Sequence, residues 1–181
     1  MSDPLIRHLR GMAGNNAWSN HRLHRACLAL DPADFAARRT GFFPSLQETL
    51  NHILLVDRYY LAFLLGREGP DFSDPVPYPR MADLAVAQQA ADRELIAFCD
   101  ALDTAVLARK VTVRRDDSTD EEDPAALLAH LFVHQIHHRG QAHAMLSGTA
   151  VAPPQLDEYF LDYDAARRAP DLRAMGLPPP R

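Results

Sequence analysis

The sequence predicts an all-α protein built as a four-helix bundle, and three observations support this prediction. Capping residues followed by proline or glutamate open the long segments. Glycine residues or Asp-Pro pairs end them, and the connections between them are short or medium in length. Four helices of about 20–27 residues joined in this way are typical of a bundle, in which side chains on facing helices project into a common core.

The first expected helix begins at Asp3 and Pro4 and continues to about Leu30. An aspartate side chain can accept hydrogen bonds from the free amides of the first turn, and a proline at the first helical position needs no acceptor there. Gly11 and Gly14 either weaken this helix or admit a close neighbour.

The second expected helix begins with the capping box Ser45-Leu46-Gln47-Glu48. In this motif the serine side chain accepts from the Glu48 amide while the glutamate reaches back to the cap. The helix continues to Leu65, and Gly66 is suited to end it. Residues 67–79 contain four prolines and are therefore expected to form a loop.

The remaining elements follow the same signals. A third helix is expected at about 81–102, and a fourth opens at Asp123-Pro124 and closes at Gly148. Between them, residues 110–115 alternate in polarity, which indicates a short strand or an extended loop. One short helix is expected at about 156–168.

The composition is that of one globular domain, expected over residues 1–170, with a flexible proline-rich tail at 171–181. Apolar residues make up 47% of the chain, enough for a core. The net charge of −5 provides no basic surface for nucleic acid. A role as a nucleic-acid binder is therefore disfavoured.

The chain offers no signal for export or membrane insertion. Its start, Met1-Ser2-Asp3-Pro4, has no apolar region of the kind found in signal peptides, and no apolar run is long enough to span a bilayer. Cys27 and Cys99 lie outside any Cys-x-x-Cys pattern and are interpreted as buried thiols in a reducing compartment. We therefore expect a cytoplasmic protein without a membrane partner.

Histidines are concentrated in the fourth expected helix. Five of the nine histidines lie between His130 and His143. At about 100° per residue, His134 and His138 fall inside an apolar stripe that also contains Leu127, Leu131 and Met145. Two neighbouring imidazoles turned into a dry interior are costly unless a shared partner satisfies them, and a transition metal is such a partner.

A third ligand is expected from the second helix. His52 shares its face with Val56, Tyr59 and Phe63, so it is a polar residue within a buried stripe. An ordinary core histidine is the alternative interpretation of His52, and the same alternative holds for the pair on the fourth helix. No His-Glu-x-x-His motif and no phosphate-binding loop is present, which argues against zinc-protease and nucleotide chemistry.

Three segments of the chain resemble the DinB family, also called DinB/YfiT-like metalloenzymes. Residues 134–141 read His-Gln-Ile-His-His-Arg-Gly-Gln and look like the family's signature. Residues 16–20 resemble its Asn-x-Trp-x-Asn segment, and residues 50–57 resemble its second-helix histidine segment. The resemblance covers roughly residues 3–165 and includes the order of the helices.

The resemblance implies an up-down-down-up four-helix bundle with a short extra C-terminal helix, commonly a homodimer. It also implies a divalent metal held by three histidines, which fall here on His52, His134 and His138, with water completing the shell. The metal in such proteins is typically nickel or zinc; iron, cobalt and manganese stay open. Family members with known activities include transferases and isomerases that use a low-molecular-weight thiol.

Two classes of function are consistent with these residues. The first is a metal-dependent enzyme, either a hydrolase or a thiol-dependent transferase, because three histidines leave a coordination position open. Tyr59 and Tyr60 could bind its substrate or could be core residues, and no catalytic residue can be named. The second class is a non-enzymatic dimeric bundle with a structural or sensory metal. In that case Phe132 and Ile136 would form the dimer face, while Arg139 is expected to point away from the interior.

Overall fold

The computed structural model describes residues 3–115 and 117–180 of the chain. Met1, Ser2 and Arg181, which belong to the expected chain start and tail, lie outside the described residues. Within the described residues the protein is mostly helical (62% helix), with seven α-helices and one small two-stranded sheet. In this part of the chain, no helix is both long enough and apolar enough to cross a membrane.

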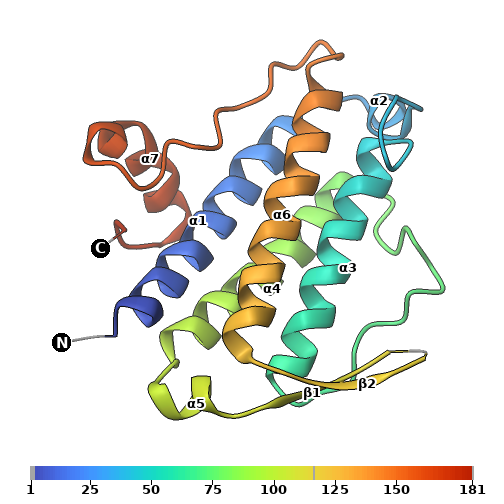
Figure 1. The fold of residues 1–181 in the computed structure, drawn as a ribbon. Coiled ribbons are helices and arrows are strands. Elements are labelled where there is room, and N and C mark those ends of the chain that lie inside the picture. The colour runs from blue at the N-terminus through green and yellow to red at the C-terminus, as the bar shows by residue number, and fades with distance from the viewer. Residues whose placement is uncertain (1–2, 116, 181) are drawn as a thin grey trace.

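The elements follow one another in an order that places four long helices at the centre. In chain order they are α1 (Pro4–Cys27), α2 (Pro32–Ala36), α3 (Leu46–Leu64), α4 (Met81–Asp100), α5 (Thr104–Ala108), β1 (Val111–Arg114), β2 (Thr119–Glu122), α6 (Pro124–Leu146), a 3-10 turn (Asp162–Asp164) and α7 (Ala165–Met175). Helix α1 packs on α4 and α6, and α3 packs on the same two helices, so the four share one core (Figure 1).

The predicted helix starts agree with the structure because their caps are local. Asp3 accepts a hydrogen bond from the Leu5 amide at 2.7 Å. Ser45 Oγ accepts from the Glu48 amide at 3.1 Å, as the capping box predicts. These side chains satisfy amides that lack partners within the helix, and so they fix where α1 and α3 begin.

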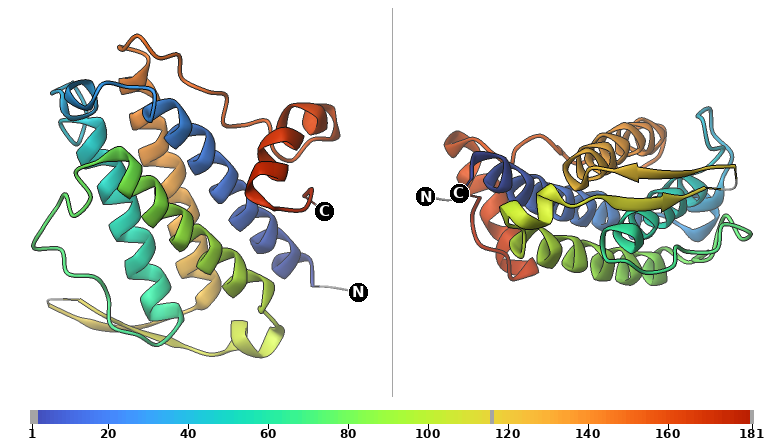
Figure 2. Two further views of the ribbon diagram at one scale, coloured as in Figure 1. Left: turned by 180° about the vertical axis from the view of Figure 1, so that it is seen from behind. Right: turned by 60° about the horizontal axis from the view of Figure 1, so that its bottom comes forward.

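The segment between α5 and α6 forms a β-hairpin at one end of the helices (Figure 2). Strand β1 pairs antiparallel with β2, with Val111 opposite Glu122. Val111 and Val113 are buried while the residues between and after them are exposed, so of the two predicted alternatives, a strand or an extended loop, the strand is the one formed. Strand β2 was not predicted, because its sequence, Thr-Asp-Glu-Glu, carries no apolar alternation.

The C-terminal helix lies later in the chain than predicted. Residues 156–161 are not helical, and α7 begins at Ala165. The reason is tertiary: the Tyr159 ring packs 5.6 Å from the Trp18 ring, and Arg22 donates to the Gln155 carbonyl at 2.8 Å. These contacts hold the segment extended along α1. A Cβ at Gly14 would collide with the Tyr159 hydroxyl. The absence of a side chain at Gly14 therefore lets Tyr159 pack close to α1.

Cys27 and Cys99 are free and buried, as predicted. Burial raises the pKa of each thiol to about 12, which keeps both protonated and unreactive at neutral pH.

Candidate metal centre

Helices α3 and α6 bring three histidine rings to one point between them. The ring centroids of His52 and His134 are 5.0 Å apart, those of His52 and His138 4.7 Å, and those of His134 and His138 4.4 Å. The pair on α6 meets because residues four apart lie one above the other on a helix face. Their neighbours in the predicted stripe, Leu127 and Leu131, are buried, which confirms the orientation of α6.

The separation of the ring nitrogens fits one shared ion. His52 Nε2 lies 3.0 Å from His134 Nε2. Two nitrogens bound to one ion at about 2.0–2.1 Å, with an angle of about 90–110°, lie about 2.8–3.4 Å apart. One ligand atom from each of the three histidines lies within 4.8 Å of the other two, so a small rotation of side chains completes the set. These three residues could therefore hold a metal ion.

Hydrogen bonding fixes the orientation of His138. Its Nδ1 lies 2.8 Å from Gln141 Oε1, and Gln141 Nε2 lies 3.0 Å from His137 Nε2. An amide oxygen can only accept, so His138 carries its proton on Nδ1 and keeps the lone pair of Nε2 for a ligand. Partners of this kind orient metal-binding imidazoles and strengthen them as ligands. Gln141 was not predicted to have this role.

The three imidazoles are neutral at physiological pH, which metal binding requires. Burial, followed by the charges of neighbouring imidazoles, lowers the pKa of His52 to about 4 and that of His134 to about 3. Burial also lowers the pKa of His138, although the hydrogen bond that its Nδ1 donates to Gln141 Oε1 raises this pKa. Each ring therefore has a lone pair available without first losing a proton.

Two phenylalanines before α3 cover one side of the histidines. The Phe43 ring lies 4.4 Å from the His52 ring and 5.6 Å from the His138 ring. The Phe42 ring lies 6.2 Å from His138, and 76% of this residue is exposed. These rings were not predicted as part of the site. The available signal was their position, directly before the cap of the helix that carries His52.

Arg139 occupies a place opposite to the one predicted. It is only 3% exposed, and its Nη1 donates to Asn16 at 2.5 Å, to Gln135 at 2.9 Å and to Asn20 at 3.1 Å. The prediction assumed that α6 buries one face. Because α6 packs on both α1 and α3, it buries a second face about 100° from the histidine stripe.

Arg139 belongs to a buried group that we call the four-helix polar network. Its members come from α1, α3, α4 and α6 and are Asn16, Asn20, Asp57, Gln88, Asp92, Gln135 and Arg139. Asp92 Oδ1 accepts from Asn20 at 2.9 Å and from Gln88 at 3.2 Å, and Gln88 also donates to Asp57 Oδ2 at 2.6 Å. Burial raises the pKa of Asp57 to about 7 and that of Asp92 to about 6.

Four further residues were predicted either to bind the substrate or to form a dimer face. Tyr59 and Tyr60 are partly buried against the core, and the Tyr59 hydroxyl lies 3.3 Å from the Arg114 carbonyl of the hairpin. Phe132 is 3% exposed and belongs to the core, which removes it from the predicted dimer face because the second buried face of α6 includes it. Ile136 is 52% exposed.

The fold and the site together define a helical protein with a three-histidine group suited to a metal. The DinB family model matches residues 1–171 of the 181-residue chain. The chain therefore belongs to the DinB family. No curated protein matches it.

Proposed function

We propose that this protein is a metal-dependent enzyme that binds one divalent transition metal through His52, His134 and His138. The observation that carries the proposal is the 3.0 Å separation of His52 Nε2 and His134 Nε2 on two different helices. Nickel or zinc is the proposed metal, because neutral imidazole is a good ligand for both. Iron, cobalt and manganese are the alternatives.

A catalytic role is supported by the kind of donor set. Structural zinc sites usually have four protein ligands with cysteine among them, whereas catalytic sites have three and leave a position for water or substrate. A bound metal of this kind lowers the pKa of a coordinated water or thiol, which makes either a nucleophile at neutral pH. The proposed reaction is therefore hydrolysis or transfer to a low-molecular-weight thiol.

The residues around the histidines support a proposal in which the substrate reaches the metal through apolar surroundings. Phe42 and Phe43 place apolar rings on one side of the ligands. Gln141 holds the His138 ring through Nδ1, so His138 Nε2 stays directed at the shared point. A small molecule with an apolar portion is the substrate that such surroundings favour.

Metal analysis of the purified protein tests the binding proposal. We expect about one divalent ion per chain. The variant in which His52, His134 and His138 are all alanine should contain none, while a His8→Ala control, changed at an exposed position of α1, should keep its ion. Equal metal content in the triple variant and the natural protein would contradict the proposal.

A turnover assay separates the enzyme from its alternative. Metal-loaded protein is incubated with a panel of small thiols and activated esters, and the His134→Ala variant is the control. Turnover that the variant lacks supports an enzyme. Metal binding that raises the melting temperature, without turnover of any substrate, supports a structural or sensory metal in a non-enzymatic bundle.

The order of the helices, the oligomeric state, the localisation and the partners are also proposals. We propose the up-down-down-up order for α1, α3, α4 and α6; the family and the directions in which Figure 1 draws these helices support it. We also propose a cytoplasmic homodimer without nucleic-acid or membrane partners. Exposed Ile136 and Val133 on α6 support a contact between two copies, and light scattering of an Ile136→Glu variant tests it.

A further inference from the structure

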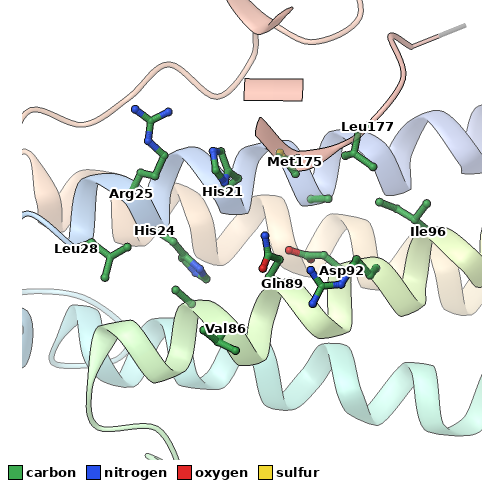
Figure 3. Close-up of a pocket in the computed structure, with 13 residues that line it drawn as sticks. His21, His24, Arg25, Leu28, Val86, Gln89, Asp92, Ile96, Met175 and Leu177 are labelled. Atoms are coloured by element: carbon green, nitrogen blue, oxygen red, sulfur yellow. The ribbon is translucent and has the colours of Figure 1, made fainter. Parts of the chain in front are cut away.

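A second cavity lies on the other side of the bundle, between α1, α4 and the end of α7. It encloses about 220 Å³. Figure 3 shows His21, His24 and Arg25 of α1 on one wall and Val86, Gln89 and Asp92 of α4 on the other, with Met175 and Leu177 beside them. None of the three proposed metal ligands lines it. The cavity is therefore a separate site.

Two buried polar groups line this cavity with hydrogen-bonding capacity to spare. His24 is 5% exposed, and its Nε2 has no hydrogen-bond partner among the described residues. Asp92 is also 5% exposed, and its hydrogen bonds from Asn16, Asn20 and Gln88 all reach Oδ1. Within the described chain, Asp92 Oδ2 accepts none. A fully buried polar atom without a partner, such as His24 Nε2, is rare and requires an explanation, whereas Asp92 Oδ2 is accessible to a ligand.

The charges of the four-helix polar network, which lies next to the cavity, favour a positively charged ligand. The four-helix polar network contains two carboxyl groups, Asp57 and Asp92, but only one cation, Arg139. Because Asp57 keeps its proton up to about pH 7, Arg139 balances Asp92 below that pH, and one negative charge is unmatched once Asp57 also ionises. A buried charge is costly unless it is paired. A positive group placed at Asp92 Oδ2 would complete the pairing.

The remaining charges at the cavity are directed elsewhere or are solvated. Arg25 Nη1 pairs with Asp171 Oδ1 at 2.7 Å. Arg93 is exposed to solvent, which weakens its charge, and its remaining effect is to lower the pKa of Asp92. Burial lowers the pKa of His24 to about 3, so this imidazole is neutral and able to accept a hydrogen bond. The other side chains at the cavity are largely apolar and include Ile96 and Met175.

We propose that this cavity, the amine site, binds a small primary amine with an apolar body. The ammonium group donates a hydrogen bond to Asp92 Oδ2, with His24 on the facing wall, and the apolar body packs against Ile96, Met175 and Leu177. The inference is independent of the proposed metal chemistry, because it uses residues of α1 and α4, whereas the proposed metal ligands lie on α3 and α6.

Calorimetric titration with three probes of equal chain length tests the amine site. n-Hexylamine, 1-hexanol and hexanoate are each added to chelator-treated protein at neutral pH, so that no amine can coordinate a metal. We expect hexylamine to bind saturably and about tenfold or more tightly than the other two, because a charge-assisted hydrogen bond is about twice as strong as a neutral one. The His134→Ala variant should bind hexylamine equally well.

Two substitutions on α4 locate the binding. Asp92→Asn should weaken hexylamine binding about tenfold or more by removing the charge. Because Asp92 belongs to a buried network, Gln89→Phe provides a second probe that obstructs the cavity from an exposed position. Ala90→Phe, exposed on the same helix and outside the cavity, is the matched control. We expect Gln89→Phe to lose binding and Ala90→Phe to retain it.

Other outcomes overturn the proposal. Preference for hexanoate would assign recognition to Arg25 and Arg93 instead of Asp92. Equal binding of the three probes would leave only apolar contact, and no saturable binding of hexylamine would remove the site altogether. Unchanged binding in Gln89→Phe would place the amine somewhere else on the protein.

Discussion

His52 Nε2 and His134 Nε2 face each other at 3.0 Å although 82 positions separate the two residues in the chain. Without an ion between them, one of these nitrogens has to donate a proton to the other. With an ion between them, both act as ligands through their lone pairs. The stability of the fold should therefore depend on the metal.

Metal loading should raise the melting temperature. At a free zinc or nickel concentration of 100 times Kd, a ligand that binds only the folded state stabilises it by about 2.7 kcal/mol. For a domain of this size, that corresponds to a rise of about 5–10 °C. Calorimetry should show the rise for the natural protein and for His8→Ala, and should not show it for His52→Ala.

Gln141→Ala should weaken metal binding about 10–100-fold while the protein stays folded. The substitution removes the acceptor that holds His138 Nδ1, so the ring loses its fixed orientation. Competition with a chromophoric chelator measures the change. Gln89→Ala, an exposed glutamine without a hydrogen bond among the described residues, is the control and should bind metal normally.

Arg139→Met should destabilise the fold by about 3–5 kcal/mol, because it leaves the buried carboxyls of the four-helix polar network without their cation. Arg139→Lys should restore only part of this loss, since an ammonium cannot reproduce the planar array of donors. Urea unfolding monitored by circular dichroism gives both values. Arg7→Met, at an exposed position without an ion pair in the described chain, should change stability by less than about 0.5 kcal/mol.

Asp57 should make the protein less stable as the pH rises. Its pKa is raised from 3.8 to about 7 by burial and by Asp92, so the folded state retains a proton that the unfolded state has lost. The stability due to this proton is complete below pH 3.8 and is lost as the pH rises through about 7.

The Asp57→Asn variant isolates this effect, because the contributions of the buried histidines are common to both proteins. The unfolding free energy of the natural protein minus that of the variant should fall by about 3–4 kcal/mol between pH 4 and 7.5. Urea titrations across this range measure the difference. A difference that is constant with pH would show that Asp57 has an ordinary pKa.

Gly14→Ala and Gly140→Ala should have opposite effects although both glycines lie within helices. A Cβ at Gly14 meets the Tyr159 hydroxyl, whereas a Cβ at Gly140 meets nothing within 4 Å. We expect Gly14→Ala to destabilise the protein by about 1–3 kcal/mol and to expose residues 150–162 to protease. Gly140→Ala should stabilise it by about 0.5–1 kcal/mol through helix propensity alone. Thermal unfolding and limited proteolysis of both variants check this.

The parts of the fold that the sequence predicts well are those with local causes. Asp3 and Ser45 cap the helices that follow them, and the buried valines of β1 alternate as a strand requires. The histidine pair was assigned correctly to one face of α6 because its partners on the helical wheel, such as Leu131, are core residues. In each case the decisive interaction lies within a few positions of the residue itself.

The remaining parts depend on contacts that a single helix does not encode. Arg139 was placed on the wrong side because its partners, Asn16 and Asn20, are more than 100 residues away. The position of α7 depends on Tyr159 packing against Trp18, and local helix signals could not reveal that contact. Phe42 and Phe43 join the site only because the turn before α3 returns over it.

The four-helix polar network has a consequence for how the site is assembled. A shift of α6 by one turn against its neighbours would leave a guanidinium and two carboxyls in the core without partners, so such packings are strongly disfavoured. Folding itself therefore fixes the spacing of the helices that carry the imidazoles. Little conformational entropy would then be lost when a metal ion binds and orders its ligands. Crystals grown with and without metal should therefore superimpose at the backbone of α3 and α6 around these histidines, with only small rotations of the rings.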